Sequence, residues 1–294
     1  MKKSYFKLNV EDGLFKILSS KPQWWCELIE DSELYCNIRK NNRINIYYRG
    51  ASIMSLSCKD EKIEAEIHNY YLGFEKGLCD KLNIKYGNVK CRPEEIVCRL
   101  PSIKKRVEAN KKNIACLEGY ELNGKNFSSE KFIQSQMYIN DKSYIDTEFA
   151  LSLDDGTDIR IDLVKLSEKG EVCFEELKLI DDGRLKPSSR KPAEILLQMD
   201  NYDRFLKEAA RLKGEKAVPI IVEYYTKVLQ IMKNIGVLRT ELKPLSVREY
   251  VSLYIEQTYT RKHPGRDKAI KTIQEVCEGL HSNIDEAAKK YNNL

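Results

Sequence analysis

Ionisable side chains interrupt two apolar stretches in the middle of the chain, where such residues are rare. Glu176 and Lys178 lie near the end of the segment 172–179, VCFEELKL, and Asp162 lies within RIDLV. Both stretches are typical of buried strands. Side chains alternate along a strand, so Glu176 and Lys178 share one face. The turn residues 168–170 join the two predicted strands, which places Asp162 across from Glu176.

Two carboxylates and one ammonium at one end of a sheet suit the hydrolysis of a phosphodiester. Neighbouring carboxylates repel each other unless a cation lies between them. Hard cations such as Mg²⁺ take one or two carboxylates together with water and phosphate oxygens. We therefore expect Asp162 and Glu176 to ligate Mg²⁺ or Mn²⁺, with the backbone carbonyl of Leu177 as a candidate further ligand. Such an ion activates water, and Lys178 would orient that water and stabilise the charge developing on phosphorus.

Each of these residues also has a plain structural interpretation. Lys178 would be a solubility lysine on an edge strand, which the apolar run before it disfavours. Asp162 would cap a turn, but it falls in the middle of a predicted strand, where aspartate is depleted. Glu175 points away from Glu176 and is expected to be structural or exposed.

The pattern resembles a known nuclease motif. Asp162 followed by ELK at 176–178 resembles the PD-(D/E)XK motif, and the predicted order of strand, strand, strand, helix, strand resembles that family's core. In the following helix, Gln198 and Tyr202 of QMDNY share one face. They resemble the QxxxY element of RecB-type and lambda-exonuclease-like members. The resemblance covers residues 127–226.

This resemblance implies a metal-dependent nuclease, with DNA favoured over RNA and exonuclease or end-processing action in DNA repair or defence against foreign DNA. Glu148 lies where many members carry a further acidic residue, although an ordinary surface glutamate is equally consistent. Gln198 and Tyr202 would support the active-site groove, or they would simply border an apolar helix stripe. The alternative function is a catalytically inactive nucleic-acid- or protein-binding module that keeps the nuclease fold.

The sequence also departs from the family pattern. Ile161 stands where the motif commonly has proline. The iron–sulfur members bracket the nuclease core with cysteines, whereas here only Cys277 follows it, so we expect no cluster.

A basic loop follows the predicted Glu176 strand and leads to the Gln198 helix. Its sequence, GRLKPSSRKP at 183–192, holds four basic residues and no acid. We expect these side chains near the mouth of the site, where they would attract backbone phosphates without reading sequence. They are Arg184, Lys186, Arg190 and Lys191. The other basic stretches, 99–112 and 261–271, are interpreted as solvated faces.

Composition narrows the class of protein. The 294 residues are 42% hydrophobic and 32% charged, with a net charge of +5, which permits a nucleic-acid partner without requiring one. The nine cysteines form no CxxC pair, which indicates reduced thiols in the cytoplasm. No 18-residue apolar window occurs, so no membrane span is expected. There is no GxGxxG or GxxxxGK[ST] loop, which disfavours a nucleotide-dependent small-molecule enzyme.

The elements that would position the site are predicted from periodicity and turn residues. An antiparallel sheet is expected over residues 30–72, helices over 92–112 and 127–139, strands over 144–153, 158–166 and 171–180, a helix over 191–212, a strand over 217–225, and helices over 227–236, 246–258 and 266–291.

We therefore expect an α+β protein of two domains. Residues 1–110 would form a β-rich domain for substrate or partner recognition. Residues 111–294 would form the nuclease-like domain, whose α/β core is a mixed four-stranded sheet flanked by helices. Whether the chain acts alone, as a homo-oligomer or with a protein partner is left open.

Overall fold

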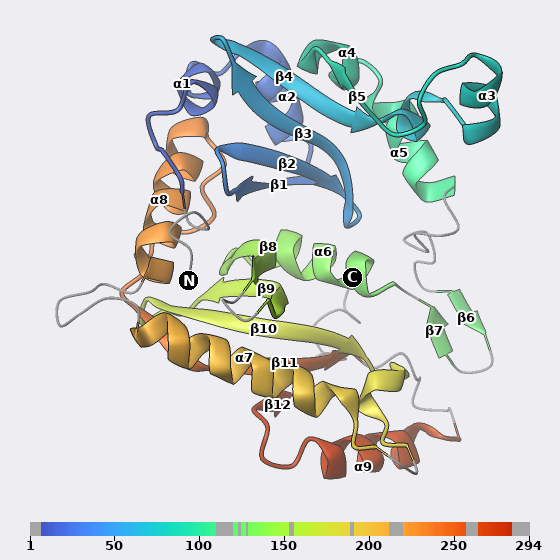
Figure 1. Cartoon of the computed structure of the whole chain (residues 1–294), viewed down its shortest axis with the longest axis vertical. Helices are drawn as coiled ribbons and strands as arrows, with labels where there is room; N and C mark the ends of the chain where they lie inside the picture. Colours follow the sequence, from blue (N-terminus) through green and yellow to red (C-terminus); the bar gives the residue numbers. More distant parts are fainter. Residues whose placement is uncertain are drawn as a thin grey trace.

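The structure, a computed structural model, describes residues 7–109, 120–122, 125–127, 129–152, 156–188, 191–211, 220–256 and 264–283. Within these ranges the chain is an α+β protein with a five-stranded antiparallel sheet, a mixed sheet and a two-stranded hairpin (Figure 1). The expected domain boundary after residue 110 falls within residues 110–119, which lie outside the described residues.

The N-terminal sheet is a five-stranded antiparallel meander. Its strands are β1 (Leu34–Arg39), β2 (Arg43–Tyr48), β3 (Ala51–Lys59), β4 (Lys62–His68) and β5 (Asn88–Cys91), paired in chain order. Asn41 and Asn42 adopt positive φ values of 62° and 55° between β1 and β2, the conformation that a tight hairpin needs and that asparagine tolerates. The antiparallel sheet predicted over residues 30–72 is confirmed, and β5 adds one strand beyond that range.

Helices cover one face of this sheet. They are α1 (Gly13–Ser19), α2 (Gln23–Glu30), α4 (Pro93–Val97) and α5 (Leu100–Ala109), with η1 (Asn69–Leu72) and α3 (Lys76–Lys81) in the connection to β5. Alternation along β2 places Ile44 and Ile46 in the apolar core, while Arg43 and Asn45 belong to the opposite face. On that opposite face, Tyr35 and Tyr47 also enter a second apolar cluster with Tyr138 of α6 (Glu130–Asn140).

The second sheet has the order β12-β11-β10-β9-β8. Its strands are β8 (Tyr144–Ser152), β9 (Asp158–Leu166), β10 (Glu171–Leu179), β11 (Ser246–Glu256) and the two-residue β12 (Ser282–Asn283). The first three predicted strands are confirmed, and they pair antiparallel, while β10, β11 and β12 run parallel. A separate hairpin joins β6 (Tyr120–Leu122) to β7 (Lys125–Phe127).

Helices α6 (Glu130–Asn140) and α7 (Glu194–Arg211) contact the strands of the mixed sheet. Both were expected, and the side chain of Ser129 caps α6 by accepting a hydrogen bond from the Phe132 amide. Helix α9 (Arg266–Val276) is shorter than the predicted helix over 266–291, of which residues 284–294 lie outside the described residues.

The predicted strand over 217–225 is wrong. Residues from 220 onward form helix α8 (Ile220–Ile235), and residues 217–219 are not described. The segment IIVEYY looks like a fully buried strand, but the helix repeats buried residues over four turns. These residues pack α8 against α1 and β1.

The predicted helix over 246–258 is also wrong. Residues 246–256 form β11, which lies parallel to β10 with Leu253 opposite Glu176. Val251, Leu253 and Ile255 are buried at alternate positions, the period of a strand. The fourth long strand of the mixed sheet therefore follows two helices rather than one.

Polar bonds join the N-terminal sheet to the rest of the chain. Arg39 of β1 forms an ion pair of 2.6 Å with Asp146 of β8, and the Trp25 indole donates a 2.8 Å hydrogen bond to the carbonyl of Ile235. One apolar cluster also includes residues from both sheets. No helix within the described ranges combines the length and hydropathy that crossing a membrane requires.

Candidate active site

The ladder between β9 and β10 opens where the acidic residues lie. Its last described pair is Leu163 with Glu175. Beyond it, the backbone N–H of Leu177 donates a 2.9 Å hydrogen bond to Asp162 Oδ2, and Lys178 Nζ lies 3.7 Å from the same oxygen. The structure therefore brings Asp162 and Lys178 together, as the alternation of the two strands predicts.

Glu176 is the most enclosed carboxylate of the group. Its Oε1 accepts hydrogen bonds from Lys178 Nζ and from Gln198 Nε2, the latter at 2.6 Å. Its Oε2 accepts a 2.7 Å hydrogen bond from the Tyr202 hydroxyl. Glu176 and Lys178 are only 2% and 1% exposed. Helix α7 thus holds Glu176 through two side chains one turn apart.

Burial and mutual repulsion control the charge of the two acids. Burial, followed by the negative charge of Asp162, raises the pKa of Glu176 to about 7. Burial also raises the pKa of Asp162, against the opposing effect of Lys178, and Glu176 is close enough to contribute to this shift. Carboxyl groups this close require a shared proton or a cation.

Glu130 belongs to the same group of acids, and the sequence did not single it out as a site residue. It is the first residue of α6, and burial raises its pKa to about 7, with further effects from Lys178 and Asp162. Its Oε2 lies 3.8 Å from the Arg184 guanidinium. An acid in the first turn of a helix is ordinary, so the sequence carries no signal that separates a site residue from a helix-dipole residue here.

Glu148 has different surroundings from those expected. The flanking pairs of the β8–β9 ladder bring it level with Asp162, but its φ of 54° reorients the residue. Its carboxylate accepts hydrogen bonds from the Tyr47 hydroxyl at 3.2 Å and from Lys131 Nζ at 3.3 Å. Its described partners therefore connect β8 to the N-terminal sheet and α6, and none of them is Glu176 or Asp162.

The basic loop lies between β10 and α7, as expected. Arg184 is fixed by Asp182, which accepts hydrogen bonds from its Nε at 3.0 and 3.1 Å, and it lies beside Glu130. Lys186 and Lys191 are exposed. Arg190 lies outside the described residues.

The donor set suits a hard divalent cation only in part. Among the described residues, no group of three or more histidine, cysteine, aspartate or glutamate side chains is placed to hold a metal ion. Asp162 and Glu176 supply two carboxylates, and the Leu177 carbonyl accepts a 2.8 Å hydrogen bond from Lys178. Two carboxylates are enough for Mg²⁺, which completes its coordination with water and phosphate oxygens.

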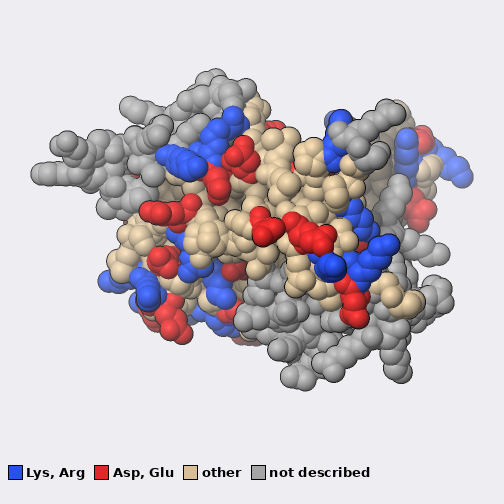
Figure 2. Space-filling model, turned by 90° about the horizontal axis from the view of Figure 1, so that it is seen from below, with Lys and Arg blue, Asp and Glu red and all other residues tan. Residues whose placement is uncertain are grey.

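Acidic and basic side chains are intermixed on the face of the molecule in Figure 2. On that face, attraction for phosphate is therefore expected from single groups rather than from a broad field.

No protein-family model, curated protein or solved structure matches the chain.

Proposed function

We propose that the chain is a Mg²⁺- or Mn²⁺-dependent nuclease of the PD-(D/E)XK type that hydrolyses phosphodiester bonds, with DNA as the favoured substrate. The observation that carries the proposal is the convergence of Asp162, Glu176 and Lys178 where β9 and β10 separate. A buried lysine beside two acids of raised pKa is costly to maintain without a function for those groups.

Each residue has a role in this proposal. Asp162 and Glu176 hold the divalent ion, which when bound supplies Lewis acidity and activates water. Lys178 orients the attacking water, whose oxygen bonds to phosphorus as the leaving P–O bond breaks. The water releases a proton to solvent, the leaving oxygen takes the electron pair of the broken bond, and Lys178 stabilises the extra negative charge. Gln198 and Tyr202 fix the orientation of Glu176 through the hydrogen bonds described above.

Arg184 is proposed to bind a substrate phosphate. The Arg184 side chain is 42% exposed, and its guanidinium lies between Asp182 and Glu130. Arginine matches phosphate oxygens with a planar fork of donors. Lys186 and Lys191, exposed on the same loop, would add attraction that does not depend on sequence.

The test is a cleavage assay on end-labelled single- and double-stranded DNA and RNA, with Mg²⁺ or Mn²⁺ and with EDTA. We expect metal-dependent cleavage by the wild type that is lost in Lys178→Ala and Asp162→Ala. The matched control is Lys207→Ala, an exposed lysine on α7, which should cleave like the wild type. Cleavage that survives in both site variants would contradict the proposal.

The second candidate is a catalytically inactive nucleic-acid- or protein-binding module. It is favoured by the internal pairing of the site, because the Lys178 ammonium and both Glu176 oxygens already have partners within the chain. Binding of nucleic acid without cleavage in either metal, on any substrate end, would favour this candidate over the nuclease.

A further inference from the structure

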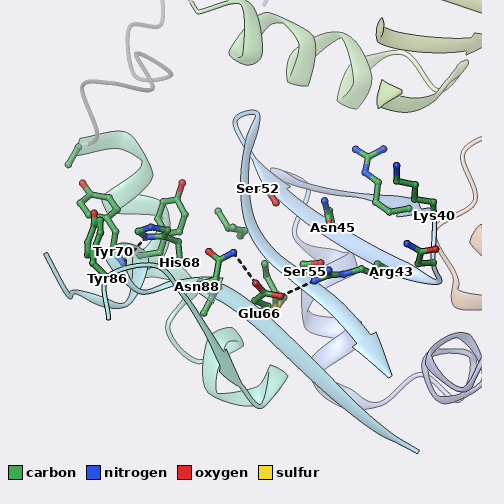
Figure 3. Close-up of a pocket in the computed structure, with 17 residues that line it drawn as sticks. Lys40, Arg43, Asn45, Ser52, Ser55, Glu66, His68, Tyr70, Tyr86 and Asn88 are labelled. Atoms are coloured by element: carbon green, nitrogen blue, oxygen red, sulfur yellow. Dashed lines mark hydrogen bonds and ion pairs between the residues drawn. The ribbon is translucent and has the colours of Figure 1, made fainter. Parts of the chain in front are cut away.

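A polar cavity lies on the N-terminal sheet, and its lining includes none of the acids described above. It has a volume of about 1000 Å³ and is lined by residues of β1 to β5 and of the segment between β4 and β5 (Figure 3). This volume is at the upper end of the range of about 300–1000 Å³ for small-molecule sites. The cavity therefore has room for more than one nucleotide-sized group.

One end of the cavity is basic. Lys40 and Arg43 lie on either side of the β1–β2 turn, and Lys40 is exposed. Among the described residues, the lining includes three cationic residues, the third being Arg39, and one carboxylate, Glu66. Arg39 is paired with Asp146 of β8. Glu66 pairs with Arg43 at 2.9 Å. Lys40 and Arg43 are side chains of the kind that bind phosphate oxygens.

Two polar atoms in the lining are incompletely satisfied. Within the described residues, Arg43 Nε and Ser55 Oγ are buried and have no hydrogen-bond partner. A buried donor without a partner is unfavourable, so a ligand that accepts from these groups would gain affinity. The lining thus presents donors to an incoming oxygen.

The other end of the cavity is aromatic. Tyr86 is 37% exposed, and its ring centroid lies 4.8 Å from that of His68 in an edge-to-face arrangement. Tyr70 lies beside them in the view of Figure 3. Exposed aromatic faces of this kind stack nucleic-acid bases, with little preference among the bases.

Polar side chains connect the two ends. Asn45, Ser52 and Asn88 line the cavity between the basic and the aromatic residues (Figure 3). Asn88 Nδ2 donates a 2.9 Å hydrogen bond to Glu66, which fixes one side of this middle section. The order of cation, amide and aromatic ring follows the order of phosphate, sugar and base in a nucleotide.

We propose that this cavity binds a single-stranded nucleic-acid segment, with a phosphate at Lys40 and Arg43 and a base stacked on Tyr86. A duplex is disfavoured, because its bases are stacked on one another and not available to the tyrosine. This inference deepens the proposed function. The claim that the bound strand is the substrate of the nuclease rests on that function. Binding itself depends only on the residues of the cavity.

Binding is measured with the full chain by fluorescence polarisation of a labelled oligothymidylate, in EDTA so that metal-dependent hydrolysis does not contribute. We expect Tyr86→Ala to weaken binding about tenfold, while Tyr86→Phe keeps the ring and stays within about twofold of the wild type. Lys40→Ala should weaken binding and reduce the slope of log K against log salt by about 0.7. Circular dichroism checks that each variant is folded, and Lys59→Ala, an exposed lysine of the same sheet outside the cavity, is the matched control.

The inference is overturned if Tyr86→Ala binds like Lys59→Ala, or if a duplex of the same sequence binds as tightly as the single strand. It is also overturned if a mononucleotide displaces the oligonucleotide at an equal concentration. A wrong nuclease proposal would give a different result. Cleavage would then be absent, while binding that depends on Tyr86 would persist.

Discussion

The Tyr202 hydroxyl donates a 2.7 Å hydrogen bond to Glu176 Oε2, although the two residues lie 26 positions apart. The tyrosine is on α7 and the glutamate on β10, so the helix that covers the sheet also orients its buried carboxylate. Burial, followed by the charge of Glu176, raises the pKa of Tyr202, so the phenol keeps its proton and remains a donor.

Replacing this donor should weaken the metal site. We expect Tyr202→Phe to reduce metal affinity about tenfold, because partners of a metal ligand typically contribute factors of 10–100. The measurement is cleavage rate against Mn²⁺ concentration, with Tyr250→Phe as the control for losing a tyrosine hydroxyl elsewhere. An unchanged Mn²⁺ dependence would show that Tyr202 is only a packing residue.

Lys178 and Glu176 should be coupled energetically. Removing one partner of a buried ion pair leaves an uncompensated charge, so Lys178→Met should lower the free energy of unfolding by about 3 kcal/mol. The double variant Lys178→Met/Glu176→Gln should lose less free energy of unfolding than Lys178→Met and Glu176→Gln lose together. Urea denaturation of the four proteins gives the coupling, and strict additivity would contradict the close contact of these groups.

The ion pair between Arg39 and Asp146 should stabilise the contact between the two sheets. Asp146 is buried and Arg39 is mostly buried, so Arg39→Met should cost about 3 kcal/mol of unfolding free energy. Lys90→Met is the control, because its pair with Glu64 is exposed and such pairs contribute little. Urea denaturation compares the two variants, and equal effects would argue against a bridging role for Arg39.

Stability should depend on pH through Glu256. Burial raises the pKa of this carboxyl from 4.5 to about 7, and its Oε2 is buried with no partner among the described residues. Between these two values the folded protein holds a proton that the unfolded chain has released, so stability falls as pH rises through this window. Above pH 7, Glu256 is ionised in the folded protein as well, and the full cost of burying its charge lowers the stability.

Glu256→Gln removes this dependence. We expect the variant to match the wild type near pH 5 and to be more stable by about 2 kcal/mol at pH 8. Urea denaturation at both values measures the difference, with the exposed Glu249→Gln as the control. A difference of the same size at both pH values would mean that Glu256 titrates normally.

Local periodicity was enough to place much of the candidate site. Strand alternation places Glu176 and Lys178 on one face, a short turn brings Asp162 opposite, and helical spacing aligns Gln198 with Tyr202. These relations need only a few neighbouring residues, and the structure brings all five side chains together.

The sequence-based predictions that were wrong concern residues whose structure depends on distant parts of the chain. Val247, Tyr250, Val251 and Tyr254 fit a helical period, but β11 is fixed by its parallel pairing with β10, about 75 positions earlier in the chain. Glu148 was expected among the acids because of the family resemblance, and it is level with Asp162 in the ladder, but its positive φ turns it toward Tyr47. Glu130 reaches the acids only through the packing of α6 on the sheet.

The most direct test of the account is the position of a bound metal ion. Crystals grown with Mn²⁺ would be measured for anomalous scattering. The account predicts a peak between Asp162 and Glu176, with carboxylate oxygens about 2.1 Å away, that is absent in crystals of Asp162→Asn. A well-ordered site without such a peak at saturating Mn²⁺, or a peak bound only by other residues, would contradict it.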